Sequence, residues 1–281
     1  MRVASGLLLV VLLIPVPSEA DQSTPPPPVG QQREPVPTLA DKIHGSDARL
    51  GLLPLHVDEA KGKVWLVLES NGPESDLGTY LYVEGLVTGL GSNPVGLDRS
   101  QLGEGRLVTF RRAGGKVLLE EQNLRFRAGT EDPLEAAAVR QSFATSVIWG
   151  GEIEAEDASG HVLVDFTPFL LRDAHEVRRR MKEAGQGDWQ LDLGRSTILP
   201  DQILAFPDNV ELEALLTYTS PEPGPLVRQT APVADTVTLV QHHSFLRLPD
   251  DDFTPRPFDP RAGYFGVGYL DYSVPLAAPL D

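Results

Sequence analysis

The sequence predicts a mainly β, α+β fold, in which antiparallel hairpins form a sandwich or barrel-like sheet accompanied by two short amphipathic helices. Runs rich in β-branched and aromatic residues recur at short spacing, with turn-forming residues between them. Helical periodicity occurs in only two places. The 281 residues include 26 glycines and 25 prolines, which is typical of a chain with many turns.

Three pairs of short runs flank glycine-containing turns, and each pair is expected to form a hairpin. The pairs are Leu52–Val57 with Lys63–Leu68, Arg106–Arg111 with Lys116–Glu120, and Ile153–Asp157 with His161–Phe166. Four further runs are expected to be strands, namely Thr79–Val87, Glu211–Tyr218, Thr236–Leu248 and Tyr264–Tyr269. This spacing does not fit alternating βαβ units, so the pairing is expected to be antiparallel.

The first predicted helix follows Asp132, which is a suitable N-cap because Pro133 then occupies the first helical position. Its apolar stripe recurs every four residues at Val139, Phe143 and Val147. The pair Gly150-Gly151 is expected to end this helix.

The second predicted helix begins at Asp173, with Glu176 three residues later as a capping-box carboxylate, and ends at Gly185. Its apolar stripe consists of Ala174, Val177, Met181 and Ala184. Four basic residues lie mostly off this stripe, at Arg178, Arg179, Arg180 and Lys182. On an acidic chain they are expected to form a solvated face rather than a recognition helix for nucleic acid.

The composition excludes several classes of function. The chain carries 24 basic and 40 acidic side chains, a formal net charge of −16, which argues against nucleic acid or an anionic membrane as partner. It contains no cysteine, which excludes disulfide frameworks, thiolate zinc sites and cysteine nucleophiles.

The N-terminus is predicted to direct export. Residues 1–20 combine Arg2, the apolar run Gly6–Ile14 and small residues before a cleavage site after Ala20, which is the pattern of a signal peptide. The apolar run is too short to span a bilayer, which needs about 20 residues. We therefore expect a periplasmic or extracellular protein without a membrane span after cleavage. Residues 21–38 contain the run Pro25–Pro28 and are expected to form a stiff linker.

No catalytic, cofactor-binding or metal-ligating residue is predicted in this chain. His175-Glu176 begins like the zinc motif H-E-x-x-H, but Arg179 stands where the second histidine ligand is required. His242 and His243 are adjacent in a predicted strand, where neighbouring side chains point to opposite faces. We therefore expect one of them to face inward and the other outward, so that they do not share a metal.

Two acidic groups leave alternatives open. Glu152, Glu154 and Glu156 share one face of a predicted strand and should face solvent unless a cation or a basic partner covers them. Asp250, Asp251 and Asp252 either bind Ca²⁺ or form an acidic turn after a strand. These groups support an alternative function, a free-standing exported binding module with an acidic, Ca²⁺-binding surface.

Three long blocks carry a resemblance to a known family. They are Gly89 to Arg99 (GLGSNPVGLDR); Ala138 to Gly150 (AVRQSFATSVIWG) with Val164-Asp165-Phe166 and Leu171 to His175; and His242 to Phe245 with Leu248 to Asp251 and Phe258 to Phe265. Together they span roughly residues 50–275 and resemble the N-terminal half of bacterial exported zinc-dependent metallopeptidases of the metzincin-like type. In that family two domains of unknown function, DUF5118 and DUF5117, precede a zinc-binding catalytic domain.

The resemblance implies a small DUF5118-like β region at residues 39–88 and a DUF5117-like accessory domain at residues 89–281, truncated at its C-terminal end. It places the family's zinc motif, H-E-x-x-H-x-x-G-x-x-H, downstream of Asp281. The expected function is therefore that of a non-catalytic accessory module, inactive alone and a fragment of the full-length protein. Zinc is implied for that protein only. The implied partner is the downstream metallopeptidase domain, and a peptide substrate is left open as a second partner.

Overall fold

The structure, a computed structural model, describes residues 37–69, 76–250, 252–254, 259–261 and 268–273. The chain divides into two units, Met1–Val36 and Pro37–Asp281, and every described residue belongs to the second. The predicted signal peptide and nearly all of the predicted linker at residues 21–38 lie outside the described residues, so both stay predictions.

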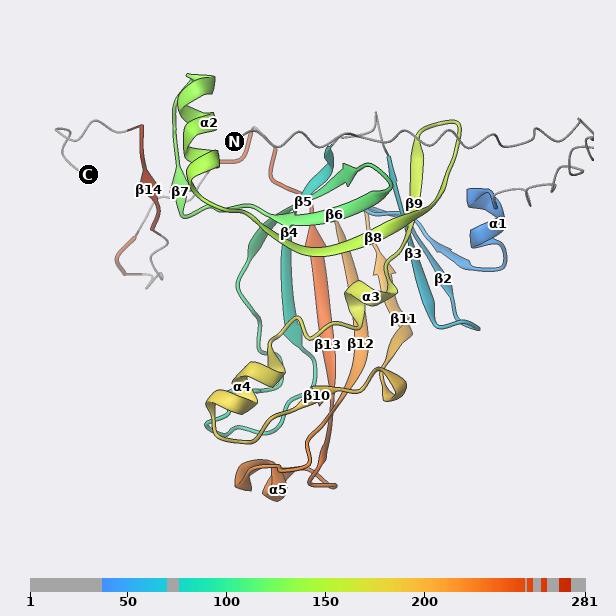
Figure 1. Ribbon diagram of the computed structural model, residues 1–281, viewed down its shortest axis with the longest axis vertical. Coiled ribbons are helices and arrows are strands. Elements are labelled where there is room, and N and C mark those ends of the chain that lie inside the picture. Colours follow the sequence, from blue (N-terminus) through green and yellow to red (C-terminus); the bar gives the residue numbers. More distant parts are fainter. Residues whose placement is uncertain (1–36, 70–75, 251, 255–258, 262–267, 274–281) are drawn as a thin grey trace, which may run out of the picture. The chain divides into compact units, whose positions relative to one another are not determined.

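Twelve of the described strands form one antiparallel sheet in the order β1-β2-β3-β9-β8-β6-β5-β4-β13-β12-β10, with β11 also paired to β12 (Figure 1). The strands are β1 (Asp47–Arg49), β2 (Leu55–Asp58), β3 (Lys63–Glu69), β4 (Asp76–Leu86), β5 (Arg106–Ala113), β6 (Lys116–Glu121), β8 (Ser146–Glu156), β9 (His161–Asp165), β10 (Gln190–Leu191), β11 (Thr197–Ala205), β12 (Asn209–Thr219) and β13 (Thr236–Leu246). All their pairings are antiparallel, which confirms the predicted mainly β class.

The described part of the chain also contains five α-helices and a short parallel pair of strands. The helices are α1 (Leu39–Ile43), α2 (Pro133–Ser142), α3 (Thr167–Leu170), α4 (Val177–Glu183) and α5 (Pro225–Thr230), and the parallel pair is β7 (Phe126–Arg127) with β14 (Leu270–Asp271). No helix within these described segments is long and apolar enough to cross a membrane.

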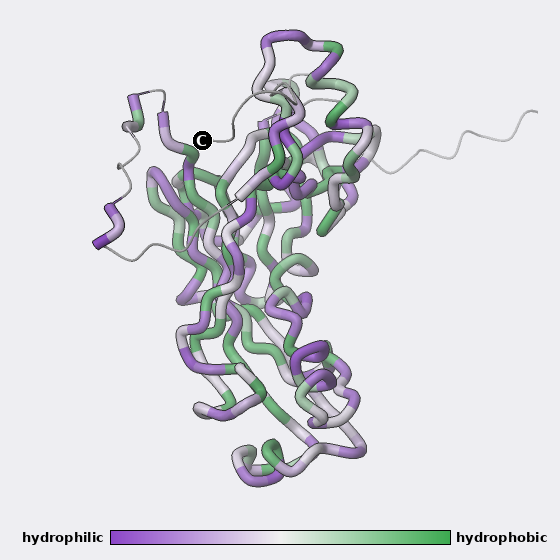
Figure 2. The backbone as a smooth tube through the Cα atoms, turned by 90° about the vertical axis from the view of Figure 1, so that its left-hand side faces the viewer, coloured by the Kyte–Doolittle hydropathy of each residue, from purple (hydrophilic) through white to green (hydrophobic). Residues whose placement is uncertain are grey.

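The three predicted hairpins are confirmed as β2–β3, β5–β6 and β8–β9. Three of the four further predicted strands are also confirmed, as β4, β12 and β13. The fourth run, Tyr264–Tyr269, lies mostly outside the described residues. Along the strands of Figure 2, hydrophobic and hydrophilic stretches are interleaved, as expected for a sheet with one buried face.

The first predicted helix begins where expected and ends too early. Asp132 is the N-cap, and its carboxylate accepts a hydrogen bond from Leu134 N at 2.8 Å. The helix stops at Ser142, however, and Val147 lies in β8, where the prediction placed it on the helix. Strand pairing overrides the helical period here, because β8 pairs with β6 from its first residue.

The predicted start of the second helix is wrong by four residues. The α4 helix begins at Val177, and Glu176 before it adopts a left-handed conformation with φ 55°. Asp173 and Glu176 therefore cannot form the expected capping box. Asp173 still caps the helix from a distance, because its carboxylate accepts hydrogen bonds from Val177 N at 2.8 Å and Arg178 N at 3.0 Å. Gly185, with φ 68°, follows the helix end as predicted.

Strand β8 joins the two halves of the sheet. Its first half pairs with β6, and its second half, from Ile153, pairs with β9 (Figure 1). At the far ends of the sheet, the loop between β1 and β2 meets the end of β11, where Leu52 N donates to Phe206 O at 2.7 Å. The sheet is therefore curved and nearly closed, which makes it barrel-like.

The inner face of this sheet encloses an aromatic core. Its buried rings include Tyr82, Phe110, Trp149, Phe166, Phe169 and Phe245. Phe166 and Phe169, at the start of and within α3, stack with their ring centroids 4.5 Å apart. On the outer face, α1 packs Leu39 and Ile43 against a second small cluster around Trp65. These rings fill the interior, so the barrel is packed rather than open.

The sheet runs through the expected family boundary between residues 88 and 89. Strand β3 pairs with β9, and strand β4 pairs with both β5 and β13. The assignment of residues 39–88 and 89–281 to separate regions stays a prediction. In the structure, strands from both regions contribute to one core.

The near-closure of the sheet gives a first prediction. A Cβ on Gly51 would lie 2.5 Å from Phe206 O, a contact that only movement of the backbone could relieve. We expect Gly51→Ala to lower the free energy of unfolding by about 1–3 kcal/mol, measured by urea denaturation. The control is Gly105→Ala, because a Cβ there meets nothing within 4 Å. Equal stability of the two variants would contradict the close approach at Gly51.

Candidate functional site

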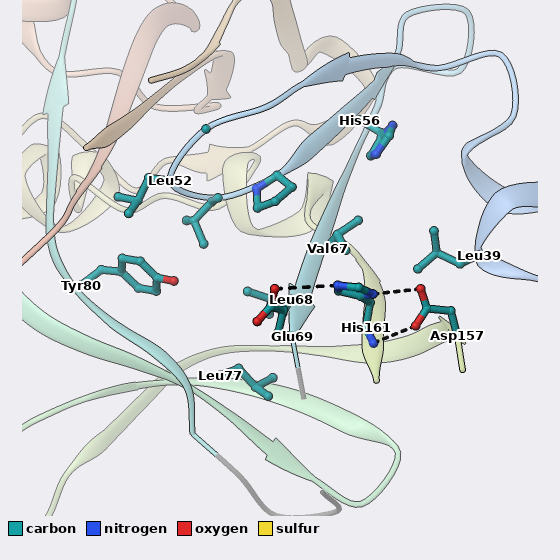
Figure 3. Close-up of a pocket in the computed structure, with 13 residues that line it drawn as sticks. Leu39, Leu52, His56, Val67, Leu68, Glu69, Leu77, Tyr80, Asp157 and His161 are labelled. Carbon is teal, nitrogen blue, oxygen red and sulfur yellow. Dashed lines mark hydrogen bonds and ion pairs between the residues drawn. The ribbon is translucent and has the colours of Figure 1, made fainter. Parts of the chain in front are cut away.

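A cleft of about 530 Å³ opens at one end of the barrel, which we call the mouth cleft (Figure 3). Its lining comes from α1, the loop between β1 and β2, strands β2, β3 and β4, the turn between β8 and β9, and the start of β9. The lining residues are Leu39, Gly51, Leu52, Leu53, Pro54, His56, Val67, Leu68, Glu69, Leu77, Tyr80, Asp157 and His161. The volume falls in the roughly 300–1,000 Å³ range of small-ligand sites, and the mouth of a barrel is a common place for them.

His161 lies between two carboxylates in this cleft. Its Nδ1 is 2.9 Å from Asp157 Oδ2, and its Nε2 is 3.8 Å from Glu69 Oε1 (Figure 3). Asp157 begins the turn that joins β8 to β9, and its Oδ1 accepts hydrogen bonds from Ser159 N and His161 N. These hydrogen bonds, first of all that from His161 N, hold the pKa of Asp157 below its usual value. Asp157 is therefore a fixed negative charge that orients the imidazole.

Two further polar side chains face the cleft. Burial raises the pKa of Tyr80, so its phenol stays protonated, and Figure 3 shows the hydroxyl directed toward Leu68 and Glu69. Burial also lowers the pKa of His56, so its imidazole is neutral at pH 7. Within the described residues, neither side chain has a hydrogen-bond partner. Both can donate or accept a hydrogen bond in a ligand complex.

The mouth cleft offers groups that can hold a ligand by charge and hydrogen bonds. A carboxylate that orients a histidine is half of a nucleophilic triad, but such a site also needs a Ser, Thr or Cys within reach of the imidazole. None of the described lining residues is of these types. The groups present offer two carboxylates, hydrogen-bonding imidazoles and a phenol around an apolar wall.

The pair His242-His243 alternates as the sequence predicts. His243 is fully buried on the inner face of β13, and His242 is only half-buried on the outer face. His243 makes hydrogen bonds of 2.9 Å to Tyr82 Oη and 3.0 Å to Gln241 Nε2. Burial lowers the pKa of His243 well below its usual value, and the nearby Arg172 charge adds to this effect. The imidazole is therefore neutral and is part of the core.

On the outer face, His242 is held between two carboxylates of β12. Its Nε2 lies 2.7 Å from Glu211 Oε2, and its Nδ1 lies 3.2 Å from Glu213 Oε1. The hydrogen bond to Glu211 raises the pKa of His242 more than burial lowers it. Burial raises the pKa of Glu211, but hydrogen bonds from His242, Asn209 and Ser244 lower it by more. The net pKa of Glu211 is therefore below its usual value. Both shifts favour the ionised forms of the two side chains.

His175 does not form part of a zinc motif. Its side chain is 1% exposed, and its Nε2 contacts Gln101 Oε1 at 3.3 Å. Burial lowers its pKa to about 4. It lies two residues before the start of α4, so it and residue 179 do not share one helical face. Arg179 instead pairs with Glu176 and Glu183.

The three glutamates on β8 are each matched to a basic side chain, one of the two outcomes that the sequence left open. Glu152 pairs with Lys116 at 2.9 Å, Glu154 with Lys42 at 2.7 Å and Glu156 with Arg112 at 2.9 Å. Asp250 and Asp252 are exposed, and Asp251 lies outside the described residues. Among the described residues, no group of three or more His, Asp or Glu side chains has the arrangement of a metal site.

Sequence reasoning did not identify the mouth cleft. The turn Asp157-Ala158-Ser159-Gly160 was visible, and it carries the only local signal, an aspartate four residues before a histidine. Glu69, Tyr80 and His56 reach the cleft from strands that are distant in the sequence. Their convergence depends on the order of strands in the sheet, which no local pattern contains.

The fold and the cleft define an antiparallel, barrel-like β module with a ligand-sized opening at one end. The chain belongs to the family described as "Domain of unknown function (DUF5117)", whose profile matches residues 100–278. No curated protein and no solved structure matches the chain. The matched region contributes Asp157 and His161 to the mouth cleft, and the other lining residues precede it.

The position of His175 outside α4 gives a second prediction. Arg179→His would complete the letters H-E-x-x-H, yet we expect no stoichiometric zinc to bind, because His175 is buried and off the helix that carries residue 179. Metal analysis after dialysis against zinc measures this, with the unmodified chain as control. One zinc per chain in the variant, absent from the control, would contradict the geometry.

The His242–Glu211 pair gives a third prediction. A raised folded-state pKa means that the stabilisation by His242 is complete below the unfolded pKa of about 6.5 and is lost as the pH rises through the folded pKa. We expect His242→Gln to cost about 1 kcal/mol more in unfolding free energy at about pH 5.5 than at about pH 8.5. Urea denaturation at the two pH values measures the difference.

The matched control is His44→Gln, because His44 is exposed at the end of α1. This variant should change the unfolding free energy only slightly, because the side chain is exposed. A pH-independent loss in His242→Gln would show that the ion pair contributes nothing to stability.

Proposed function

We propose that this chain is the non-catalytic accessory module of an exported zinc-dependent metallopeptidase-like protein. Membership of the DUF5117 family over residues 100–278 supports the assignment of the module. The blocks from Gly89 to Phe265 support the link to metallopeptidases, because they resemble the region that precedes the zinc domain in that family. Residues 39–88 would then be the DUF5118-like region of the same protein.

One observation supports the non-catalytic role. Each histidine considered as a zinc ligand from the sequence, namely His175, His242 and His243, has hydrogen-bond partners within the chain. His175 and His243 are buried in the core with neutral imidazoles. His242 is bound by two carboxylates on the opposite face of the sheet. Zinc requires several such ligands around one point, and these three side chains do not converge.

The proposed partner is a catalytic domain of the same polypeptide that supplies the zinc ligands. When zinc is bound there, it would activate water for peptide hydrolysis. Cleavage of the leader after Ala20 would place the mature module in the periplasm or outside the cell, with residues 21–38 as a stiff spacer. Removal of Arg2 and Glu19 together leaves the net charge of −16 unchanged, so the acidic surface belongs to the mature protein.

The fourth prediction tests the non-catalytic role. The purified chain is dialysed against zinc, analysed for bound metal and incubated with casein, with and without a chelator. We expect far less than one zinc per chain and no chelator-sensitive hydrolysis, because His175, His242 and His243 have hydrogen-bond partners within the chain and do not converge on one point. Stoichiometric zinc together with chelator-sensitive proteolysis would overturn the proposal.

The second candidate function is a free-standing exported binding module, and the open mouth cleft is the observation that favours it. The glutamates of β8 favour its Ca²⁺ version less, because each already has a basic partner. The DNA after codon 281 distinguishes the two candidates. An in-frame continuation that encodes H-E-x-x-H supports the accessory module, and a stop codon supports the free-standing one.

A further inference from the structure

We infer that the mouth cleft binds the side chain of a lysine or arginine presented by a peptide. The inference does not depend on a metallopeptidase partner, because it rests on the charge, the walls and the hydrogen-bonding groups of the cleft. It assigns a ligand class to a site that the family description leaves open.

The charge of the cleft favours a cation. Asp157 and Glu69 are acidic, and none of the described lining residues is a lysine or arginine. The hydrogen bonds around Asp157 keep it ionised, and the chain as a whole, at −16, adds a long-range field of the same sign. An anionic ligand would meet the carboxylates of Asp157 and Glu69 with no lysine or arginine among the described lining residues, so phosphates and acidic peptides are disfavoured.

The walls of the cleft fit the stem of such a side chain. Leu52, Leu68 and Leu77 line it together with other apolar residues (Figure 3). Lysine and arginine bury their methylene groups along apolar surface and keep the charged head at a polar site. The cleft offers this combination, with apolar residues from β3 and β4 and the carboxylates of Glu69 and Asp157 at its polar side.

The hydrogen-bonding groups of the cleft complete the fit. The Tyr80 hydroxyl faces into the cleft and, among the described residues, has no hydrogen-bond partner (Figure 3). An ammonium group has three donors and a guanidinium group has five, so either can use a phenol oxygen in addition to a carboxylate. Glu69 is the most adaptable of these groups because its side chain is 87% exposed and free to move onto a ligand.

The fifth prediction compares three capped tripeptides that differ in the central residue. They are acetyl-Ala-Lys-Ala-amide, its norleucine analogue, which keeps the stem and lacks the charge, and its glutamate analogue. Their dissociation constants are measured by NMR titration near pH 7.5 at low salt. We expect the lysine peptide to bind at least about fivefold more tightly than the norleucine peptide, and the glutamate peptide most weakly.

Two matched variants place the effect at the cleft. Glu69→Gln should weaken binding of the lysine peptide about fivefold and leave the norleucine peptide unchanged. Glu59→Gln, an exposed acid in the turn between β2 and β3, should change neither. Thermal melting should show that both variants remain folded, since both side chains are exposed.

Three results would overturn the inference. The first is lysine and norleucine peptides of equal affinity. The second is the same effect of Glu69→Gln and Glu59→Gln, which would indicate attraction by the net charge alone. The third is no binding of the lysine peptide at millimolar concentration.

Discussion

The near-closure of the sheet and the position of the mouth cleft both depend on the hydrogen bond from Leu52 N to Phe206 O. It brings together the two ends of a sheet that β8 has already bent, and the aromatic rings on the inner face then pack into one core. The same contact fixes the loop between β1 and β2 beside the mouth cleft, where residues 51–54 form part of the lining. Core and cleft therefore have a common origin, and Gly51 permits it because a side chain there would collide with the backbone of Phe206.

The alternation of side chains along the strands assigns the polar residues to their roles. In β13, a shift of one residue separates a fully buried His243, whose pKa is lowered, from a half-buried His242, whose pKa is raised. The two histidines are adjacent in the sequence, yet burial determines the pKa of His243 and the neighbouring carboxylates determine the pKa of His242. At the barrel mouth, Tyr80 and His56 have no hydrogen-bond partner among the described residues and remain available to a ligand.

Short-range sequence patterns correctly predicted the features of this fold that depend only on residues near one another in the chain. The three hairpins, the N-cap Asp132 and the opposite orientations of His242 and His243 all follow from turn chemistry and period-two alternation. The errors arose where tertiary pairing prevailed. Val147 continued a helical period and nevertheless entered β8, because β6 offered it a partner strand. The mouth cleft could not be predicted, since its residues meet only through the order of strands in the closed sheet.

In this DUF5117 member, the mouth cleft exposes polar and apolar side chains side by side. The histidines that suggested a metal, His175, His242 and His243, instead have hydrogen-bond partners within the chain. Intermolecular nuclear Overhauser effects test binding at the mouth cleft most directly, between the ε-methylene protons of a lysine peptide and the methyl groups of the protein. The structure predicts contacts to Leu52, Leu68 and Leu77. Contacts confined to methyl groups elsewhere, such as the exposed Leu134 of α2 or Leu270 of β14, would contradict it.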